Sequence, residues 1–406
     1  MSERRRILFV KDALAYPRVS GHDVPCFEMV RAMRSLGHDV ALATTAPLHE
    51  ETRATLEAPW FSLAGTRDSG RSYASPLSYL QERFRSYWGI SPDVVENVAR
   101  TAAEFQADAM IGVGLDALPF MAGTRGCVKV WYAADEWFLH HVTLFRPLQK
   151  ATYGELQAAL IKGLYERCYA PSIDRAWVVS SDEQVAMRRY AGVKNVDIVA
   201  NGVDTDFFTP SAVEAQPQSA VFWGRLDFGP NLQALEWFCN RIWPGVRARV
   251  PSATLTVMGF NAAPAVLALH GRDGIDVRTD VPDIRPTVAM NQIAILPMIS
   301  GGGIKNKLLE AAALGKAIVC TSRALGGLRG TPPVVVVDDE QAWIDAVTAL
   351  WQDHARRNAL ERAARDWVLE RHTWLAAAQD GMAGLEASLS TRRTGAAPST
   401  FTSGRM

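Results

Sequence analysis

Short apolar runs alternate along this chain with stretches in which apolar residues recur every three or four positions. Residues 7–10 (ILFV) form the first run, 26–37 (CFEMVRAMRSLG) carry the helical period, and 38–44 (HDVALAT) form the second run. Runs of this length are typical of strands buried on both faces, and the longer period is typical of amphipathic helices. The alternation predicts an α/β fold with a parallel sheet covered by helices on both faces.

The alternation occurs twice, with one interruption. In the first half we expect further strands at 109–114, 128–133 and 175–180, and then a helix with Ser181 as its N-cap and Gly192 as its stop. In the second half we expect strands at 220–226, 253–259, 274–279, 292–298 and 316–322. The sequence therefore predicts two doubly wound, Rossmann-like domains.

These elements divide the chain into five parts. We expect a first domain at 1–208, a polar, proline-containing linker at 209–218, a second domain at 219–371, a C-terminal helix at 372–388, and a disordered tail at 389–406. Ligands of open α/β sheets bind at the carboxyl ends of the strands. The two domains are therefore expected to face a central cleft that holds the ligand.

Composition narrows the class of protein. The 406 residues include 43 basic and 43 acidic side chains, so charge gives no reason to expect a nucleic acid partner. The five cysteines are scattered and never form a CxxC pair, which predicts a reducing, cytoplasmic compartment and no zinc site. No apolar run approaches the roughly 20 residues of a membrane-spanning helix. Peripheral contact with the inner face of a membrane stays open.

The candidate chemistry centres on residues 298–322 (MISGGGIKNKLLEAAALGKAIVCTS). Three glycines at 301–303 follow an apolar strand and open a helix, so backbone N–H groups and the helix dipole could hold a diphosphate. Lys305 and Lys307 add cations, and Glu310 could accept hydrogen bonds from ribose hydroxyls. The segment is not a P-loop, because no Gly-Lys-Ser/Thr follows the glycines. An ordinary glycine turn beside a solvated lysine face is the alternative.

Five segments, in the same order, resemble those of the family-4 glycosyltransferases (glycosyl transferases group 1). They are residues 20–40, 197–208, 223–238, 279–288 and 301–322. The chain looks closest to bacterial sugar transferases associated with exopolysaccharide gene clusters. The resemblance implies the GT-B fold, with two Rossmann-like domains facing a central cleft and a last helix that packs back on the first domain.

The resemblance also implies an activity of the hexosyltransferase type. A sugar would move, with retention, from a nucleotide-sugar donor (UDP- or GDP-sugar) to a hydroxyl of a saccharide or lipid-linked acceptor, with no obligatory metal or cofactor. Arg225 matches the arginine that contacts the donor phosphates, and Glu310 matches the glutamate that holds the ribose. The expected catalytic residues are Asp135, Arg225, Lys307 and Glu310, and the expected donor-binding residues are Gly21, Gly301, Gly302, Gly303, Ile304 and Lys305.

The sequence departs from the family pattern at several positions. Gly302 stands where many members carry a glutamate that contacts the transferred sugar, and Pro230 stands where many carry a lysine. Some members also have an acceptor-side histidine in the segment that here offers Asp135 and Glu136, with His140 and His141 further on. We favour Asp135 as an active-site contact, against the alternative that this charged pair is an N-terminal helix cap.

Together these patterns predict a glycosyltransferase of surface polysaccharide or glycoconjugate synthesis. A nucleotide-sugar epimerase of the same fold is one alternative, and it would need carboxylates and histidines grouped around one sugar. A non-catalytic partner subunit that binds nucleotide sugar is the other alternative, and the departures at Gly302 and Pro230 favour it.

Overall fold

The structure, a computed structural model, describes residues 3–15, 23–63, 92–133, 138, 141–142, 145, 150–301 and 303–393. The chain forms two compact units. The N-terminal unit comprises Met1–Val199 together with Ala377–Met406, and the C-terminal unit comprises Ala200–Ala376. The division falls ahead of the linker expected at 209–218.

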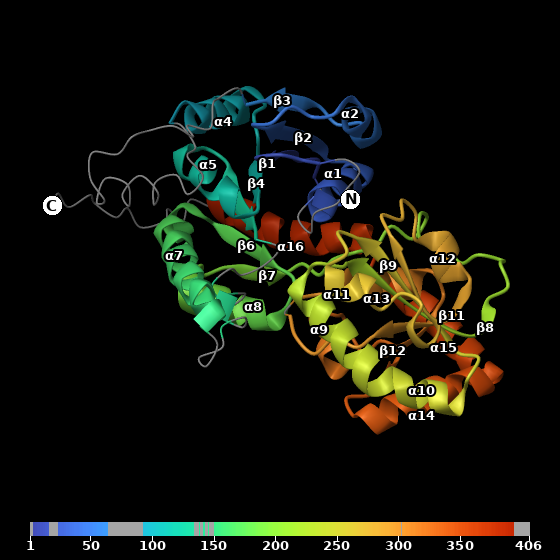
Figure 1. Ribbon diagram of the computed structural model, residues 1–406. Helices are drawn as coiled ribbons and strands as arrows, with labels where there is room; N and C mark the ends of the chain where they lie inside the picture. Colours follow the sequence, from blue (N-terminus) through green and yellow to red (C-terminus); the bar gives the residue numbers. More distant parts are fainter. Residues whose placement is uncertain are drawn as a thin grey trace. The chain divides into compact units, whose positions relative to one another are not determined.

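A seven-stranded parallel sheet forms the N-terminal unit, in the order β3-β2-β1-β4-β5-β6-β7 (Figure 1). Its strands are β1 (Arg6–Lys11), β2 (Asp39–Thr44), β3 (Trp60–Ser62), β4 (Ala109–Val113), β5 (Val128–Tyr132), β6 (Arg175–Val178) and β7 (Val196–Ile198). Its helices are α1 (Asp23–Ser35), α2 (Glu50–Leu56), α4 (Pro92–Glu104), α5 (Leu118–Gly123), α7 (Tyr153–Tyr169) and α8 (Ser181–Ala186). The strand order reverses between β1 and β4, as in doubly wound sheets.

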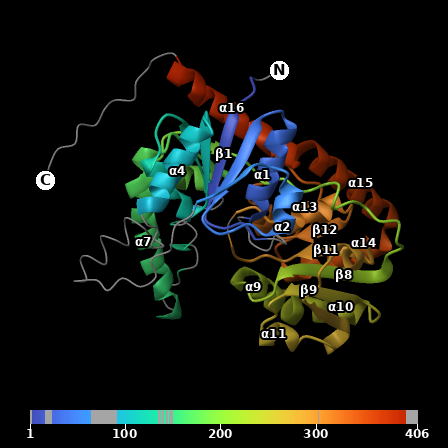
Figure 2. The ribbon, with the colours of Figure 1, turned by 90° about the horizontal axis from the view of Figure 1, so that it is seen from above.

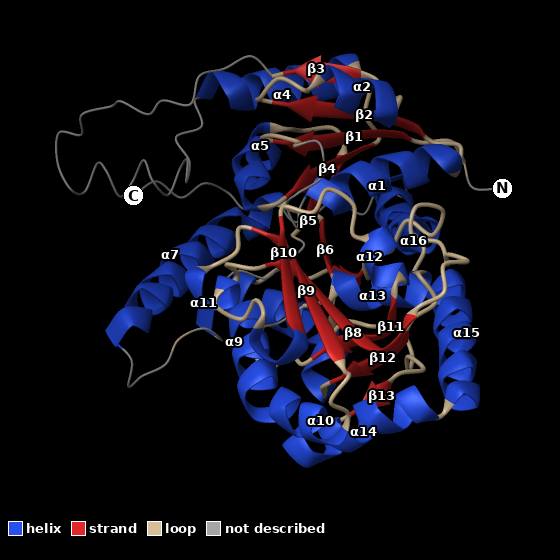
Figure 3. Cartoon of the chain, turned by 45° about the vertical axis from the view of Figure 1, so that its right-hand side comes forward, coloured by secondary structure: helices blue, strands red, loops and turns tan. Residues whose placement is uncertain are grey.

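The C-terminal unit repeats this plan with six parallel strands, in the order β10-β9-β8-β11-β12-β13. Its strands are β8 (Gln216–Arg225), β9 (Thr254–Phe260), β10 (Ile275–Thr279), β11 (Asn291–Leu296), β12 (Ala317–Cys320) and β13 (Val335–Val336). Its helices are α9 (Gly229–Trp237), α10 (Trp243–Arg249), α11 (Pro264–Leu267), α12 (Arg285–Ala289), α13 (Asn306–Ala313), α14 (Glu340–Gln352) and α15 (His354–Arg371). Figure 3 shows the strands of this unit between its helices.

The last helix, α16 (Trp374–Arg393), follows α15 and belongs to the N-terminal unit from Ala377 onward (Figure 2). Glu386 on α16 accepts two hydrogen bonds from the guanidinium of Arg5, at 2.8 Å and 2.6 Å. Arg5 directly precedes β1, and its side chain is buried. This bidentate pair therefore fixes α16 beside the amino end of the first strand.

The expected strands are confirmed, and one expected helix cap is wrong. The apolar run at 7–10 is fully buried within β1. The N-cap of α8 is Ser180 instead of Ser181, because the Ser180 side chain accepts a hydrogen bond from the Glu183 amide at 3.3 Å. Gly192 ends the helical segment with a φ of +83°, as predicted. Among the described residues, no helix is long and apolar enough to cross a membrane.

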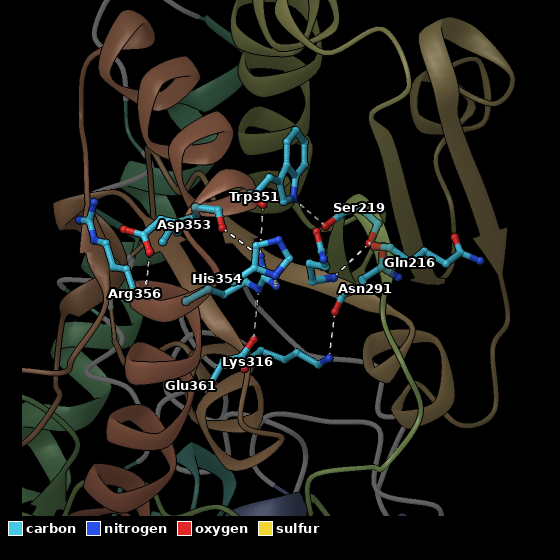
Figure 4. A network of polar contacts seen from close by, with 12 residues as sticks. Gln216, Ser219, Asn291, Lys316, Trp351, Asp353, His354, Arg356 and Glu361 are labelled. Atoms are coloured by element: carbon cyan, nitrogen blue, oxygen red, sulfur yellow. Dashed lines mark hydrogen bonds and ion pairs between the residues drawn. The ribbon is translucent and has the colours of Figure 1, made fainter.

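A network of polar contacts in the C-terminal unit connects β8, β11, α14 and the residue before β12 (Figure 4). Lys316, which is 9% exposed, donates from Nζ to the carbonyl oxygens of Ala289 and Asn291 at 2.8 Å and 2.9 Å. The Trp351 indole on α14 donates to the carbonyl oxygen of Ser219 on β8 at 3.2 Å. Burial lowers the pKa of Lys316, whose partners are backbone carbonyls. This lysine therefore serves the packing of the unit.

Candidate functional site

The glycine turn expected at 301–303 lies between β11 and α13 in the C-terminal unit. β11 is buried along its length, and α13 begins at Asn306. Gly301 and Gly303 have φ angles of +86° and +66°, which residues with side chains rarely adopt. A Cβ atom at Gly301 would also lie 3.1 Å from Cγ of Pro230. Backbone conformation and close packing therefore both require glycine at Gly301.

Lys305 occupies the N-cap position of α13 and reaches back over the turn. Its Nζ donates to the carbonyl oxygens of Gly301 and Gly303, each at 3.3 Å. A Cβ atom at Gly301 would lie 3.6 Å from this Nζ and 3.1 Å from Pro230. A cation is thus present close to Pro230, although the lysine typical of the family at that position is absent.

Lys307 points from α13 toward the first strand of the sheet. Its Nζ donates to Oδ1 of Asn231 at 2.7 Å and lies 4.1 Å from the ring centroid of Phe222 on β8. Burial lowers the pKa of Lys307 to about 7, and the Glu310 charge only partly offsets this effect. A Cβ atom at Gly224 would lie 3.2 Å from the Lys307 Nζ, so glycine at this position leaves room for the ammonium group.

Glu310 lies one turn further along α13, and Trp223 on β8 holds its carboxylate. The Trp223 indole donates to Oε2 of Glu310 at 2.7 Å. Burial raises the pKa of Glu310, while the Trp223 hydrogen bond and the Lys307 charge act in the opposite direction. Among the described residues, no other hydrogen bond to the Glu310 carboxylate is present, so Oε1 can accept one from a ligand.

Arg225 ends β8, and its guanidinium is already engaged. Nε and Nη2 donate to the two carboxylate oxygens of Asp227 at 2.6 Å and 3.0 Å, and the Arg225 side chain is 56% exposed. The guanidinium holds the pKa of Asp227 below its usual range. The Arg225 backbone carbonyl accepts a hydrogen bond from Nδ2 of Asn231 at 2.7 Å. If Arg225 contacts the donor phosphates, as the family resemblance implies, its guanidinium must first leave Asp227.

Sequence reasoning missed the side chains that hold the predicted residues in place. They are Trp223, Asp227 and Asn231, which contact Glu310, Arg225 and Lys307 respectively. All three lie in segment 223–238, but their residue types alone do not predict which side chains they contact. The buried Oγ of Ser300, directly before the turn, has no hydrogen-bond partner among the described residues. The side chain of Ile304 packs against the core of the unit.

The N-terminal unit places a buried ion pair at the carboxyl end of β1. Nζ of Lys11 lies 2.9 Å from Oδ1 of Asp23, the first residue of α1, and both side chains are buried. Cys26, one turn into α1, is fully buried, which raises the pKa of its thiol to about 12. This pair joins the end of the strand to the start of the helix.

Several predicted positions lie outside the described residues. These are Gly21, Asp135, Glu136, His140 and Gly302. Nearby, Nδ1 of His141 contacts Oε2 of Glu155 at 2.6 Å, and Nζ of Lys162 contacts the other ring nitrogen at 2.8 Å. Within the described part of the chain, no group of three or more histidine, cysteine or acidic residues could hold a metal ion.

A known family model matches part of the C-terminal unit. Residues 217–353 match the family model described as Glycosyl transferases group 1. A protein described as an uncharacterized 44.6 kDa protein in the cps region of Klebsiella pneumoniae is 30% identical over 134 residues. That alignment covers 30% of this chain and 34% of the relative, so the chain spans about a third of the curated relative it matches. These matches confirm the family resemblance stated from the sequence.

Solved structures of the same architecture cover nearly the whole chain. Anabaena Alr3699/HepE, in complex with UDP and glucose, gives a TM-score of 0.64 at 14% identity, covering 95% of this chain and 100% of that one. A mutant of S. aureus TarM, in complex with Fondaparinux, alpha-GlcNAc-glycerol and UDP, gives 0.66 at 8% identity, covering 94% and 99%. The fold is therefore GT-B, with two doubly wound Rossmann-like units, as predicted.

Proposed function

We propose that this chain is a glycosyltransferase that uses a nucleotide-sugar donor. The observation that carries the proposal is the arrangement around α13, where a glycine turn, a partly buried lysine and a tryptophan-held glutamate lie within ten residues of one another, from Gly301 to Glu310. The turn and Lys307 would bind the diphosphate, and Oε1 of Glu310 would accept hydrogen bonds from the ribose hydroxyls. The match of this unit to group 1 glycosyl transferases supports the same assignment.

The chemistry that these groups would assist is displacement of a nucleoside diphosphate. The bond between the anomeric carbon and the β-phosphate oxygen breaks, a bond to the acceptor oxygen forms, and the acceptor proton passes to the diphosphate. Negative charge develops on the departing diphosphate, so fixed N–H donors and ammonium groups lower the barrier. We infer retention at the anomeric carbon from the family resemblance.

The donor and acceptor are proposed by class. HepE was solved with UDP and glucose, which supports a UDP-sugar here, and a GDP-sugar is the alternative donor. The acceptor would be a saccharide or a lipid-linked saccharide at the inner face of the membrane. The relative from a cps region supports a role in surface polysaccharide synthesis.

Calorimetric titration of UDP, GDP and ADP tests the donor site. We expect one nucleotide to bind at micromolar affinity and Glu310→Gln to lose about 1–3 kcal/mol of binding free energy, because a charged acceptor is replaced by a neutral one. Glu236→Gln, on the exposed face of α9 in the same unit, is the matched control and should bind normally. Equal binding by both variants would remove Glu310 from the site.

A nucleotide-sugar-binding partner subunit without turnover is the second candidate function. Two observations favour this second function. The Arg225 guanidinium is already paired with Asp227, and Pro230 stands where many family members carry a lysine. The two candidate functions differ in whether the bound nucleotide sugar is turned over. Formation of free UDP from a UDP-sugar, dependent on added acceptor, supports the transferase, whereas tight binding without turnover over a panel of acceptors supports the partner subunit.

A further inference from the structure

A pocket of about 1010 Å³ lies at the amino end of the sheet in the N-terminal unit. Its lining residues come from the start of β1, the end of α1, the start of β2 and the end of α2, which pack together in the fold (Figure 1). Ligands of open α/β sheets bind at the opposite, carboxyl edge. This pocket therefore lies outside the site described above, and we call it the amino-end pocket.

The lining of the amino-end pocket is rich in guanidinium groups. They belong to Arg4, Arg6, Arg31 and Arg34. The first two lie at the start of β1, and the other two lie three residues apart on one face of α1. Among the described residues that line the pocket, only Asp39 and Glu57 carry carboxylates. The lining therefore has an excess of positive charge.

Two of the four arginines have a carboxylate nearby. Arg4 pairs with Asp39, and Nη1 of Arg31 lies 3.4 Å from Oε2 of Glu28. Asp39 is also in register with Arg6 on the neighbouring strand. The hydrogen bond from Arg4, followed by the charges of Arg4 and Arg6, lowers the pKa of Asp39. One carboxylate is thus shared between the two arginines at the start of β1.

The other two arginines have only neutral partners. Nη1 of Arg6 donates to Oε1 of Gln106 at 3.2 Å, and its guanidinium carbon lies 4.9 Å from the ring centroid of Phe105. Nη1 of Arg34 donates to the carbonyl oxygen of Leu56 at 3.3 Å. Within the described part of the chain, neither arginine forms an ion pair, and the buried Nε of Arg6 has no hydrogen-bond partner. An oxyanion in the pocket would supply both the negative charge and the missing acceptor.

We propose that the amino-end pocket binds a soluble small molecule that carries two phosphate groups. The planar fork of an arginine matches the oxygens of a phosphate, and the pocket presents two pairs of such forks, one from β1 and one from α1. Its volume is that of a site for a small organic ligand and exceeds what one phosphate ion fills. This binding goes beyond the proposed function and does not rest on it, because it needs neither the glycine turn nor α13.

Calorimetric titration of the full chain with inorganic diphosphate, without divalent metal, tests the pocket. We expect one diphosphate to bind at least tenfold more tightly than inorganic phosphate, because two arginine pairs are engaged instead of one. Arg6→Gln with Arg34→Gln should weaken diphosphate binding at least tenfold. A diphosphate could also enter the donor site, so the titration is repeated with Lys307→Met in the other unit, which should keep the binding.

Two further double variants separate this site from a general effect of charge. Arg53→Gln with Arg100→Gln removes two positive charges from the same unit, and Arg53 stacks on Trp60 at 4.9 Å, as Arg6 does on Phe105. This control should bind diphosphate normally. Arg6→Lys with Arg34→Lys keeps the charge but not the planar forks, and should bind more weakly than the unmodified protein and more tightly than the glutamine pair. Thermal melts check that each variant folds, and the lysine pair carries the test if the glutamine pair does not fold.

Three results would overturn the proposal. The first is no binding of diphosphate, or binding that Lys307→Met abolishes. The second is equal weakening in the Arg53/Arg100 control and in the Arg6/Arg34 variants, which would reduce the effect to net charge. The third is displacement of bound diphosphate by phosphatidylglycerol vesicles, which would assign the arginines to lipid headgroups instead of a soluble ligand.

Discussion

A buried lysine in one unit and a partly buried lysine in the other show how differently the two units surround a positive charge. Lys11, at the end of β1, lies 2.9 Å from the Asp23 carboxylate and 3.7 Å from that of Asp12. Lys307, on α13, donates to a neutral amide and lies against an aromatic ring. Burial disfavours the charge on both. For Lys11, the neighbouring Cys26, Asp23 and Asp12 outweigh burial and raise the pKa, whereas the pKa of Lys307 falls to about 7.

The different surroundings indicate a structural role for the Lys11 ammonium group and a ligand-binding role for that of Lys307. A carboxylate within the protein balances the Lys11 ammonium, so this pair stabilises the fold and offers little to an anionic ligand. Among the described residues, no carboxylate lies within ion-pair distance of Lys307, and the Glu310 charge offsets only part of the effect of burial on its ammonium group. A diphosphate would supply the missing negative charge. Four predictions test this comparison.

The largest expected effect is on stability, from Lys11→Met. Removing the lysine takes the balancing charge away from the buried Asp23 carboxylate, which should cost about 3–5 kcal/mol of the free energy of unfolding, measured by denaturant titration. Lys307→Met should cost less than half as much, because no buried ion pair is broken. The double variant Lys11→Met/Asp23→Leu should recover most of the loss. If it is no more stable than Lys11→Met alone, the ion pair is not what fixes α1 to β1.

The next effect is on nucleotide affinity, from Lys307→Met. Loss of a charged donor to the diphosphate should cost about 1.5–3 kcal/mol of binding free energy in a calorimetric titration of UDP. Lys316→Met is the control, because Lys316 is a buried lysine of the same unit whose ammonium group binds only backbone carbonyls (Figure 4). It should lower stability and leave affinity unchanged. Equal affinity losses in both variants would mean that unit packing, and not the Lys307 charge, supports binding.

The third effect is on the pH dependence of binding. The pKa of Lys307 is about 7 without ligand, and a bound diphosphate should raise it. Above pH 7 Lys307 is mostly neutral in the free protein and must take up a proton when the diphosphate binds. Affinity should therefore fall by up to about 1.4 kcal/mol per pH unit between pH 7 and pH 9. Calorimetry in two buffers of different ionisation enthalpy measures the proton uptake directly, and Lys307→Met should show none.

The fold was largely predictable because its strands are continuous apolar runs, which the sequence displays directly. The run at 292–298 became β11, and the helical pattern after it became α13, ending before Gly315 with its φ of +65°. The cap of α8 was misplaced because Ser180 and Ser181 are adjacent and of the same type, so only geometry decides which hydroxyl meets the Glu183 amide.

The site was predictable as a segment but not as a set of contacts. Residues 301–310 are continuous in sequence, so their chemistry could be inferred from spacing. The side chains that hold them come from β8 and α9, some 80 residues earlier in the chain, as with Trp223 to Glu310. Such pairings depend on strand order and side-chain direction, which composition does not encode. Asp227 differs in being only two residues from Arg225, but its pairing still depends on side-chain direction and becomes visible only in the structure.

The smallest expected effect concerns the Arg225–Asp227 ion pair. Like Lys11 and Asp23, these two side chains are paired within the protein, but their pair is exposed. If Arg225 contacts the diphosphate, it must first leave Asp227. Asp227→Asn removes the competing charge and should tighten UDP binding by about two- to threefold, since exposed ion pairs are weak. Asp276→Asn is a matched control, because Arg278 pairs with Asp276 at the same spacing on β10. An unchanged affinity in Asp227→Asn, equal to that of the control, would remove Arg225 from the phosphate contacts and leave Lys305 and Lys307 as the cations of the site.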